Sequence, residues 1–560
     1  MLMRHRKGMA DPIKFLRDSI ALAALATSLP AFAQKAGHSF EAMNEDVRSS
    51  FGENAAGPRI DDTVLQPFER LSPPHEESPV SEDVAMVIGA INIRGIAELT
   101  PSDLAASYER FIGQNASAET LRNLINSIAA HARERGYIFA SAQIPAQAVR
   151  LGIVTVELDI GQIDEVRIVG TDNDRLRKTL APLVGGNPHA SLIERQLLLA
   201  GELPGISIAR TDYLREGGAG VLVVEAREIP AIGYAALDNF GSARFGPIRA
   251  RLRLDLNGIF ADDDSVTVHA ISTIAQPREM VFVNARYAKT LGDGATVIGI
   301  AASAGLTRGD SNLRGHNRYA AIFASNALVR GNGFNLWLNG ELAYLNVSQA
   351  REGVLFEEDD LVTASVNFAA NANIGIGRIY GGIGATRGLA IGGTTEVGDP
   401  LASRANASAR FTRAFAWFDS ALDLGTGFGL RIAANGQIAS RPLLSSQEFS
   451  IGGPYSVRGY DFSERFGDEG IAGLVELRKD FDNPTSTLDW LQLYTFLDGG
   501  YARNIGTGFG GGTLVSAGGG LRARLDDFDF AIEAATPLTN IRLESADKSP
   551  QINLHTGLRF

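Results

Sequence analysis

The chain has 560 residues, which exceeds one ordinary domain and indicates several domains, or one very large domain with smaller neighbours. Hydrophobic residues make up 45% and charged residues 21%, so the composition excludes a disordered chain. The absence of cysteine excludes disulfides, thiolate metal sites and cysteine nucleophiles. A net charge of −12 argues against general affinity for nucleic acid, because such binding needs a basic face.

Residues 1–33 predict a secretory signal peptide. A basic start leads into a short apolar run at residues 19–30, and Ala31-Phe32-Ala33 has the A-x-A form of a cleavage site. The run is too short for a transmembrane helix, which needs about 20 residues. No later segment reaches about 18 uninterrupted apolar residues, so the mature protein is expected to be either soluble or a β-barrel.

Residues 34–83 predict a linker that contains a short helix. Apolar residues recur at near-helical spacing between residues 39 and 51, after the candidate N-cap Ser39. Residues 71–80 form a proline-rich acidic stretch that is typical of a linker. The alternative for residues 39–51 is a disordered leader.

Residues 84–160 predict a compact β-α-α-β-β unit. Thr100 and Pro101 form a helix start, with a capping hydroxyl followed by proline at the first helical position. A second helix follows Ser117 and carries one apolar stripe. The expected strands are residues 87–93, 138–143 and 153–160.

Residues 161–230 repeat this order. Such a repeat at the start of an exported chain indicates two tandem modules. The expected strands are residues 166–169, 206–213 and 221–228, and the expected helices are residues 176–184 and 192–203.

From residue 231 to residue 560 the sequence predicts strands with one polar and one apolar face. Arg251 and Arg253 alternate with Leu252 and Leu254, for example, and similar alternation continues to the last residue. Many such strands, separated by turns rich in glycine and aspartate, favour a barrel with a lipid-facing wall and a polar lumen. The alternative is a soluble sheet whose final strand is buried.

The length of this region indicates the number of strands. About 330 residues accommodate roughly 16 strands at about 20 residues each, counting the connections. A barrel of that size leaves an aqueous channel. The predicted fold class is mainly β: a transmembrane antiparallel β-barrel of about 16 strands, preceded by two small β-α-α-β-β domains.

Two motifs stand out within the barrel region. The first, Gly452-Gly453-Pro454-Tyr455-Ser456-Val457-Arg458-Gly459-Tyr460, lies in a glycine-rich connection. The second, Phe496-Leu497-Asp498-Gly499-Gly500, lies on a strand whose alternation turns Asp498 towards the lumen. Arg458 offers a planar fork of donors that can pair with such a carboxylate. The alternative is two unrelated polar side chains in a wet pore.

These features together resemble the two-partner secretion transporters of the haemolysin and filamentous-haemagglutinin type, within the POTRA-plus-barrel outer-membrane insertase superfamily. The two small modules resemble POTRA domains, and Phe560 resembles the terminal assembly signal of outer-membrane barrels. The motif residues that carry the resemblance are Val457, Arg458, Gly459 and Tyr460 of a V-R-G-Y loop motif and Phe496, Asp498 and Gly500 of an F-x-D-x-G strand motif. The resemblance implies that a long loop folds into the barrel, where Arg458 contacts Asp498.

The resemblance also implies a function and partners. It implies a pore in the bacterial outer membrane whose periplasmic POTRA domains capture an unfolded exported protein, which then passes to the cell surface. The implied partners are a large secreted cargo protein, outer-membrane lipid and the barrel-assembly machinery. The alternatives are an outer-membrane insertase, which usually carries more POTRA modules, and a diffusion porin, which needs neither the modules nor the V-R-G-Y loop.

The sequence offers no sign of enzymatic chemistry. We find no G-x-x-x-x-G-K-[ST], H-E-x-x-H or G-x-S-x-G motif, and the eight histidines are scattered. No cofactor, metal ion, nucleotide or nucleic acid is therefore expected to bind, and the protein is not expected to be an enzyme.

Overall fold

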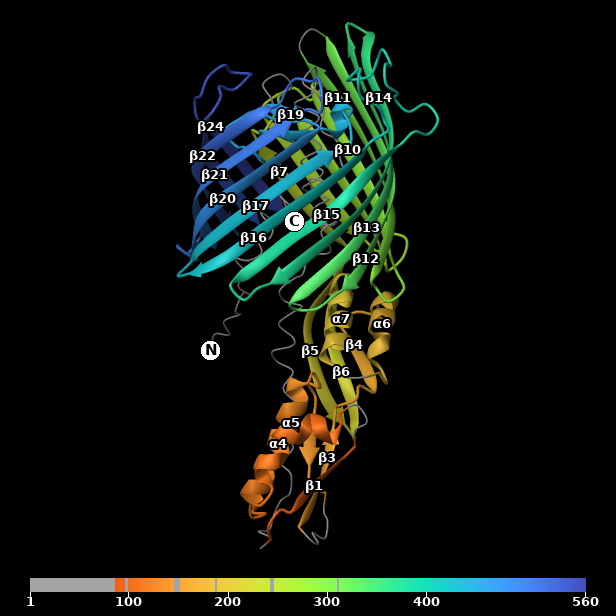
Figure 1. Cartoon of the computed structure of the whole chain (residues 1–560), viewed down its shortest axis with the longest axis vertical. Helices are drawn as coiled ribbons and strands as arrows, with labels where there is room; N and C mark the ends of the chain where they lie inside the picture. The colour runs from red at the N-terminus through yellow and green to blue at the C-terminus, as the bar shows by residue number, and fades with distance from the viewer. Residues whose placement is uncertain (1–85, 96–98, 146–151, 187–188, 242–245, 310–311) are drawn as a thin grey trace, which may run out of the picture.

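The computed structural model describes residues 86–95, 99–145, 152–186, 189–241, 246–309 and 312–560. Two small α/β units lie in line beneath a large barrel (Figure 1). The signal peptide predicted at residues 1–33 and the helix predicted near residues 39–51 fall outside the described residues. Among the residues that are described, no helix is long and apolar enough to cross a membrane.

The first small unit has the predicted order β-α-α-β-β. Its three strands form a sheet in the order β1-β3-β2, in which β1 runs parallel to β3. The first strand starts three residues later than predicted, and residues 137–140 form a turn that shortens β2, because the Ala140 amide donates to the Tyr137 carbonyl at 2.8 Å. The elements are β1 (Ala90–Arg94), α4 (Pro101–Tyr108), the 3-10 turn η1 (Glu109–Phe111), α5 (Ala118–Glu134), β2 (Ser141–Gln143) and β3 (Ile153–Asp159).

Local sequence explains the start of α4. The Thr100 hydroxyl accepts from the Asp103 amide, and the Thr100 amide donates to the Asp103 carboxylate at 2.9 Å, which completes a capping box. The Thr100 hydroxyl also donates to the Asp103 carboxylate at 2.6 Å, and this bond together with that from the Thr100 amide holds the pKa of Asp103 below its usual value. The predicted apolar stripe of α5, including Leu124 and Ile128, is buried against the sheet.

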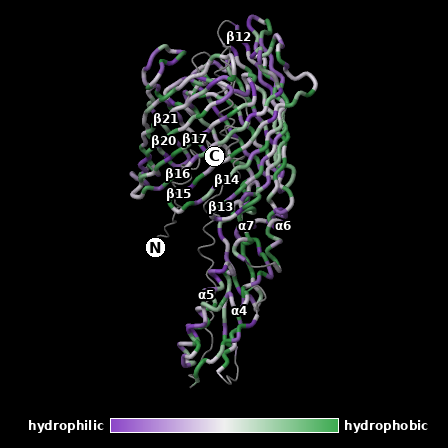
Figure 2. Tube along the Cα trace, in the orientation of Figure 1, coloured by the Kyte–Doolittle hydropathy of each residue, from purple (hydrophilic) through white to green (hydrophobic). Residues whose placement is uncertain are grey.

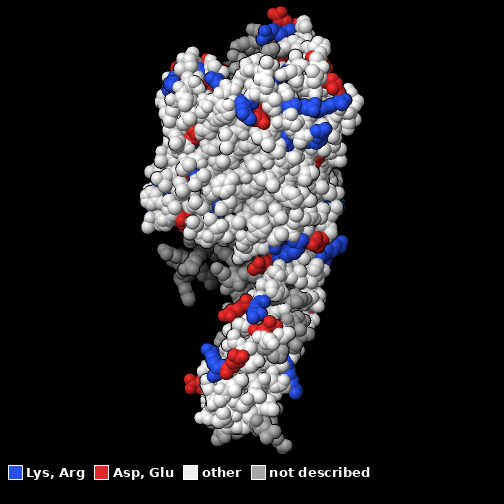
Figure 3. Space-filling model, in the orientation of Figure 1, with Lys and Arg blue, Asp and Glu red and all other residues white. Residues whose placement is uncertain are grey.

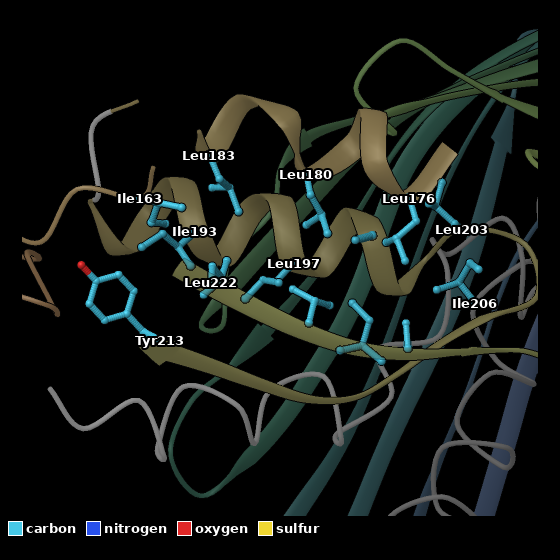
Figure 4. Packing of buried hydrophobic residues seen from close by; sticks show 14 of the residues in the cluster. Ile163, Leu176, Leu180, Leu183, Ile193, Leu197, Leu203, Ile206, Tyr213 and Leu222 are labelled. Carbon is cyan, nitrogen blue, oxygen red and sulfur yellow. The ribbon is translucent and has the colours of Figure 1, made fainter. Parts of the chain in front are cut away.

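The second small unit repeats the order and lies between the first unit and the barrel (Figure 1). Its sheet has the order β4-β6-β5, and leucines of both helices pack on it, as Figure 4 shows for Leu176, Leu180 and Leu197. Phe139 of the first unit stacks on Tyr213 of the second with ring centroids 3.9 Å apart, which joins the two cores. The elements are β4 (Glu165–Val169), α6 (Asp174–Leu180), η2 (Ala181–Leu183), α7 (Ala190–Gly201), β5 (Ile206–Glu216) and β6 (Ala219–Glu228).

The barrel is closed and has sixteen antiparallel strands, which confirms the predicted fold class. It closes where β24 pairs with β7, from Tyr234 opposite Arg559 to Asp238 opposite His555. The strands are β7 (Ala231–Asp238), β8 (Arg249–Asn257), β9 (Asp264–Thr273), β10 (Met280–Leu291), β11 (Thr296–Gly309), β12 (Leu313–Val329), β13 (Phe334–Arg351), β14 (Val354–Asn373), β15 (Gly377–Leu389), β16 (Thr412–Gly425), β17 (Phe428–Ala439), β20 (Glu469–Asp482), β21 (Trp490–Arg503), β22 (Gly512–Leu525), β23 (Phe528–Pro537) and β24 (Gln551–Arg559).

The barrel wall has the two faces that the alternating sequence predicts. On β20, Glu476 and Arg478 face the lumen and are buried, whereas the outward Val475 and Leu477 are 47% and 43% exposed. The resulting outer surface is a belt largely free of charge, with charged side chains above it (Figure 3), and apolar and polar residues alternate along the strands (Figure 2). This arrangement suits a wall in contact with lipid around a polar interior.

Two loops at the end of the barrel away from the small units fold against its inner wall. One is residues 440–468, between β17 and β20, which contains η3 (Ser445–Gln447) and a hairpin of β18 (Phe449–Ile451) and β19 (Arg465–Gly467). The other is residues 390–411, between β15 and β16. Because both loops contact lumen-facing side chains, they occupy part of the space that the strand number predicted to be an aqueous channel.

The second small unit is docked on the opposite end of the barrel. Arg175 donates to the Gly292 carbonyl at 2.8 Å, and Arg195 donates to the Ala327 carbonyl at 3.3 Å. Leu199 of α7 joins a buried cluster with Ala295, Ala327 and Trp337 of the barrel. These contacts hold the unit against the turns that connect β10 to β11 and β12 to β13.

Candidate functional site

The loop of residues 440–468 is fixed to the barrel wall by Arg458. Its side chain is buried, with Nε donating to Asp498 Oδ2 at 2.9 Å, and its backbone amide donates to the same oxygen at 3.1 Å. Nη1 donates to Glu476 Oε2 at 2.8 Å and to Glu533 Oε2 at 3.0 Å. One guanidinium therefore ties the loop to β20, β21 and β23 at once.

The Phe496 ring packs against the Arg458 guanidinium. The Arg458 guanidinium carbon lies 3.3 Å from the centroid of the Phe496 ring, which is the geometry of a cation–π contact. Phe496 and Asp498 both point inward from β21, two residues apart, so one strand supplies a ring and a carboxylate to the same guanidinium. This explains why the two residue types occur at this spacing.

The carboxylates that receive Arg458 have further partners. Glu476 Oε1 accepts from Arg478 Nε at 2.6 Å and from Arg522 Nη1 at 2.9 Å. Glu533 Oε2 also accepts from the Tyr494 hydroxyl at 3.0 Å. Buried charges need partners, and this network pairs the Arg458 charge with three carboxylates, while Arg458 Nη2 makes no hydrogen bond with the described residues.

The neighbours of Arg458 in the motif fit the wall closely. The Gly459 amide donates to Ser516 Oγ at 3.0 Å, and the same hydroxyl donates to Asp498. A side chain at Gly459 would lie 2.8 Å from Ser516 Cβ and 2.9 Å from the Pro537 nitrogen, so only glycine fits without movement of the loop. Val457 is fully buried in an apolar cluster with Ile451 and Leu514.

Tyr460 fastens the far end of the motif. Its ring is buried, and its hydroxyl lies 2.9 Å from Thr539 Oγ1 and accepts from the Asn540 amide at 3.1 Å. These two residues follow β23, so Tyr460 links the loop to the next connection at the same end of the barrel. Gly500 lies on the lumen side of β21, where a Cβ atom would lie 2.8 Å from Ile451 Cγ2 of β18.

Phe560 lies apart from this site, at the seam of the barrel. Its amide donates to the Gly233 carbonyl at 3.0 Å and its carbonyl accepts from the Gly233 amide at 2.7 Å, which extends the pairing of β24 with β7. The ring lies over Gly233 and is 65% exposed on the outer face.

The structure thus brings together six of the residues singled out from the sequence, namely Val457, Arg458, Gly459, Tyr460, Phe496 and Asp498, and places Gly500 beside them. Sequence analysis missed Glu533 and Ser516 and did not connect Glu476 with Arg458. Their inward position follows from strand alternation, but their distance from Arg458 depends on how β20 to β23 are aligned, which no local pattern specifies.

The second lumen loop was also missed. Residues 390–411 place Ala407 and Phe411 in a buried apolar cluster with lumen-facing side chains of β9 to β14 and with Leu443 and Leu444 of the first loop. Arg404 joins the two loops, since its Nη1 donates to Glu448 at 2.6 Å and to Asp468 at 2.7 Å.

The site has no arrangement typical of metal-dependent chemistry. In the part of the chain that the structure describes, no group of three or more His, Cys, Asp or Glu side chains could hold a metal ion. What the arrangement can do is hold a loop inside a barrel through directional hydrogen bonds from one arginine to three carboxylates.

Comparisons with known proteins show which family has this architecture. The family described as haemolysin secretion/activation protein ShlB/FhaC/HecB matches residues 217–523, and the ShlB-type POTRA domain matches residues 86–161. The heme/hemopexin transporter protein HuxB of Haemophilus influenzae is 22% identical over 395 residues, which cover 67% of this chain and 69% of that protein.

Solved structures agree in fold. CdiB from Escherichia coli superposes with a TM-score of 0.71 at 18% identity, covering 93% of this chain and 98% of that one. CdiB from Acinetobacter baumannii gives 0.62 at 16% identity, with 93% and 97% covered. The protein is an outer-membrane transporter with periplasmic POTRA domains that acts with a large secreted partner protein. Since the family match spans more than half of its residues, the chain belongs to the haemolysin secretion/activation protein family ShlB/FhaC/HecB.

Proposed function

We propose that this transporter moves its partner protein outward in an unfolded, extended form, and that the loop fixed by Arg458 controls the route through the lumen. The observation that carries the proposal is the position of this loop, held inside the barrel by a buried contact among three carboxylates. A chain that passes through the barrel must share the lumen with the loop or displace it.

The POTRA units are the proposed capture surface. Among the described residues, their sheet orders leave β1, β2, β4 and β5 with one unpaired edge each, and β5, with eleven residues, is the longest of these edge strands. An extended peptide can add to such an edge through main-chain hydrogen bonds, with side chains adding specificity. The docking of the second unit on the barrel places this edge next to the entrance of the lumen (Figure 1).

Energy for transport is proposed to come from the partner itself. The sequence carries no phosphate-binding loop, so folding or capture of the partner outside the cell is the proposed driving force. An insertase remains the alternative function, and BamA from Haemophilus ducreyi lacking POTRA domains 1–3 shares the fold with a TM-score of 0.50 at 12% identity. The family match favours secretion over that alternative.

Deletion of residues 84–229 tests the proposal. In cells that also express a large exported protein chosen as the candidate cargo, we expect cargo at the surface to fall at least tenfold. The barrel should still enter the outer membrane and migrate faster on gels before heating than after. If cargo still reaches the surface without these residues, capture lies elsewhere and a porin becomes the better interpretation.

We propose that Phe560 serves as the signal read by the barrel-assembly machinery. The support is its position directly after the closing strand β24, where it continues the hydrogen bonding with Gly233, with its ring exposed on the outer face. Deletion of Phe560 should lower the amount of heat-modifiable barrel several-fold, whereas Phe560→Tyr should preserve it. Equal assembly of the deletion variant and the wild type would reject this role.

A further inference from the structure

Three arginines form a basic patch on the outer wall of the barrel, outside the lumen site. They are Arg308 of β11 and Arg314 and Arg318 of β12, all with exposed side chains. Strand alternation turns them outward, because their neighbours Thr307, Leu313 and Tyr319 are buried on the other face. This set is called the outer arginine patch below.

The height of the patch on the wall coincides with the edge of the membrane. Outward-facing Leu328 lies at the periplasmic end of β12, and Arg318 lies ten residues further towards the cell exterior. At about 3.4 Å per residue and a tilt near 40°, this span rises about 26 Å, which matches the apolar band of about 25 Å in outer-membrane barrels. Tyr344, opposite Ala320 and 43% exposed, occupies the level typical of the aromatic girdle.

The arginines of the patch have no partner among the residues that the structure describes. Arg308 and Arg314 lie directly opposite each other on adjacent strands, a like-charge pair that is unfavourable unless an anion lies between them. None of the three guanidinium groups makes a hydrogen bond or ion pair with a described residue, and the electrostatic neighbour of Arg318 is the Tyr344 hydroxyl. Even with Asp310 of the intervening turn, which falls outside the described residues, the group keeps a net positive charge.

Nearby carboxylates are already engaged. Asn346 faces Arg318 on β13, and its amide donates to Glu358 at 3.2 Å and to Asp360 at 3.1 Å. The Tyr344 hydroxyl also donates to Asp360 at 2.7 Å. Glu358 and Asp360 therefore lie on the β13–β14 side, away from Arg308 and Arg314. The acidic residues beside these two arginines are Asp310 of the intervening turn and Glu279, whose carbonyl accepts from the Arg308 amide at 2.7 Å.

We propose that the outer arginine patch binds the phosphate groups of a phosphorylated glycolipid in the outer leaflet. The argument for this ligand is the position of the patch at the exterior edge of the apolar belt, where such headgroups lie. Arginine suits it because the guanidinium fork binds phosphate oxygens in a bidentate manner. A phosphate between Arg308 and Arg314 turns an unfavourable pair into a bridged one and fastens β11 to β12.

Binding to purified full-length protein in detergent tests the proposal, with bound lipid counted by native mass spectrometry. The probes are diphosphoryl lipid A, lipid A without its phosphates, phosphatidylglycerol and inorganic phosphate. The triple variant Arg308→Gln, Arg314→Gln, Arg318→Gln should bind diphosphoryl lipid A at least tenfold more weakly than the wild type. Arg410→Gln is the matched control, since Arg410 is an exposed arginine that pairs with Glu396 at 3.2 Å, and it should bind normally.

The other probes show which phosphate-bearing molecule binds the outer arginine patch. Lipid A without phosphates should bind the wild type and the triple variant equally weakly. If phosphatidylglycerol binds as tightly as diphosphoryl lipid A and with the same dependence on the arginines, the assignment to the glycolipid is wrong. Tight binding of inorganic phosphate alone, or equal binding of lipid A by both proteins, also overturns it.

A stability measurement keeps the proposal testable if the triple variant assembles poorly. In lipid-free detergent, Arg308→Gln should leave the unfolding midpoint unchanged or raise it, because a like-charge pair is removed. In the presence of diphosphoryl lipid A, the same variant should lose the rise in midpoint that the wild type gains. A fall of equal size under both conditions would mean that Arg308 acts only within the protein.

Discussion

The two sides of the lumen hold their loops by different forces. On the wall of β20 to β23, Arg458 is bound by Asp498, Glu476 and Glu533 in a buried charged network. On the wall of β9 to β14, the loop of residues 390–411 is held by apolar contacts of Phe411 and Ala407, together with hydrogen bonds to β14 such as that from the Ser403 amide to Asp359 Oδ1 at 3.0 Å. Hydrogen bonds between charged groups have strict geometry, whereas apolar contacts have little directional preference. We therefore expect the loop of residues 440–468 to detach from the wall in one step when the Arg458 contacts break. The loop of residues 390–411 is expected to detach from its apolar contacts gradually.

The largest effect is expected from Arg458→Ala. Removal of one partner of a buried ion pair costs about 3–5 kcal/mol, because the remaining charges stay buried without it. Cargo secretion should fall at least tenfold, while barrel levels fall much less because strand pairing supplies most of the cohesion of the barrel. Arg458→Lys should secrete more than Arg458→Ala, since it keeps the charge but loses the fork. Arg441→Ala, an exposed arginine of the same loop, is the control.

A double-mutant cycle with Asp498→Ala sharpens this test. If the two residues act through one contact, the double variant should secrete little less than either single variant. Secretion measured as surface cargo and normalised to heat-modifiable barrel gives the coupling. Losses that add independently, or normal secretion by Arg458→Ala, would contradict the proposed role of the pair.

A smaller loss is expected from Gly459→Ala, which keeps every charge. The added methyl group would lie 2.8 Å from Ser516 Cβ, so the loop must shift away from the wall and lengthen the hydrogen bonds of Arg458. We expect secretion to fall several-fold, between the values for Arg458→Lys and Arg458→Ala. Gly333→Ala, where a Cβ atom meets nothing within 4 Å, is the control. Wild-type secretion by Gly459→Ala would show that the close fit is unimportant.

Phe411→Ala tests the apolar side. Loss of a buried phenylalanine costs about 3–5 kcal/mol of packing. Since this packing holds a loop that occupies part of the lumen, the basal conductance of single barrels in planar bilayers should rise, while secretion stays within about twofold of the wild type. Phe260→Ala, an exposed phenylalanine at the other end of the barrel, should leave the conductance unchanged. Unchanged conductance in Phe411→Ala would mean that this loop does not restrict the lumen.

The smallest effect is expected from Tyr460→Phe. This change removes only the hydroxyl that contacts Thr539 and the Asn540 amide, a contribution of about 0.5–1.5 kcal/mol per hydrogen bond. Secretion should stay well within twofold of the wild type, but amide hydrogen exchange at residues 539 and 540 should become faster. Unchanged exchange there would show that the hydroxyl does not fasten the two connections.

The sequence by itself determined the periodic parts of this protein. The alternation of Arg251 and Arg253 with Leu252 and Leu254 predicted which face meets the lumen, and the length of the region predicted about sixteen strands. Thr100 and Pro101 predicted the start of α4 because a capping hydroxyl and proline act within one turn of helix. The pairing of Arg458 with Asp498 came from the family resemblance of two motifs, and the inward position of Asp498 came from alternation.

Only the tertiary structure decided which distant side chains meet in the lumen. Glu533 and Ser516 reach the loop because the register of β20 to β23 brings them level with it, and register depends on contacts along whole strands. The second lumen loop escaped prediction because residues 390–411 have no repeating pattern, and Phe411 is buried only through side chains supplied by β9 to β14. Local patterns specify the faces of the strands, whereas closure of the barrel specifies their neighbours across the lumen.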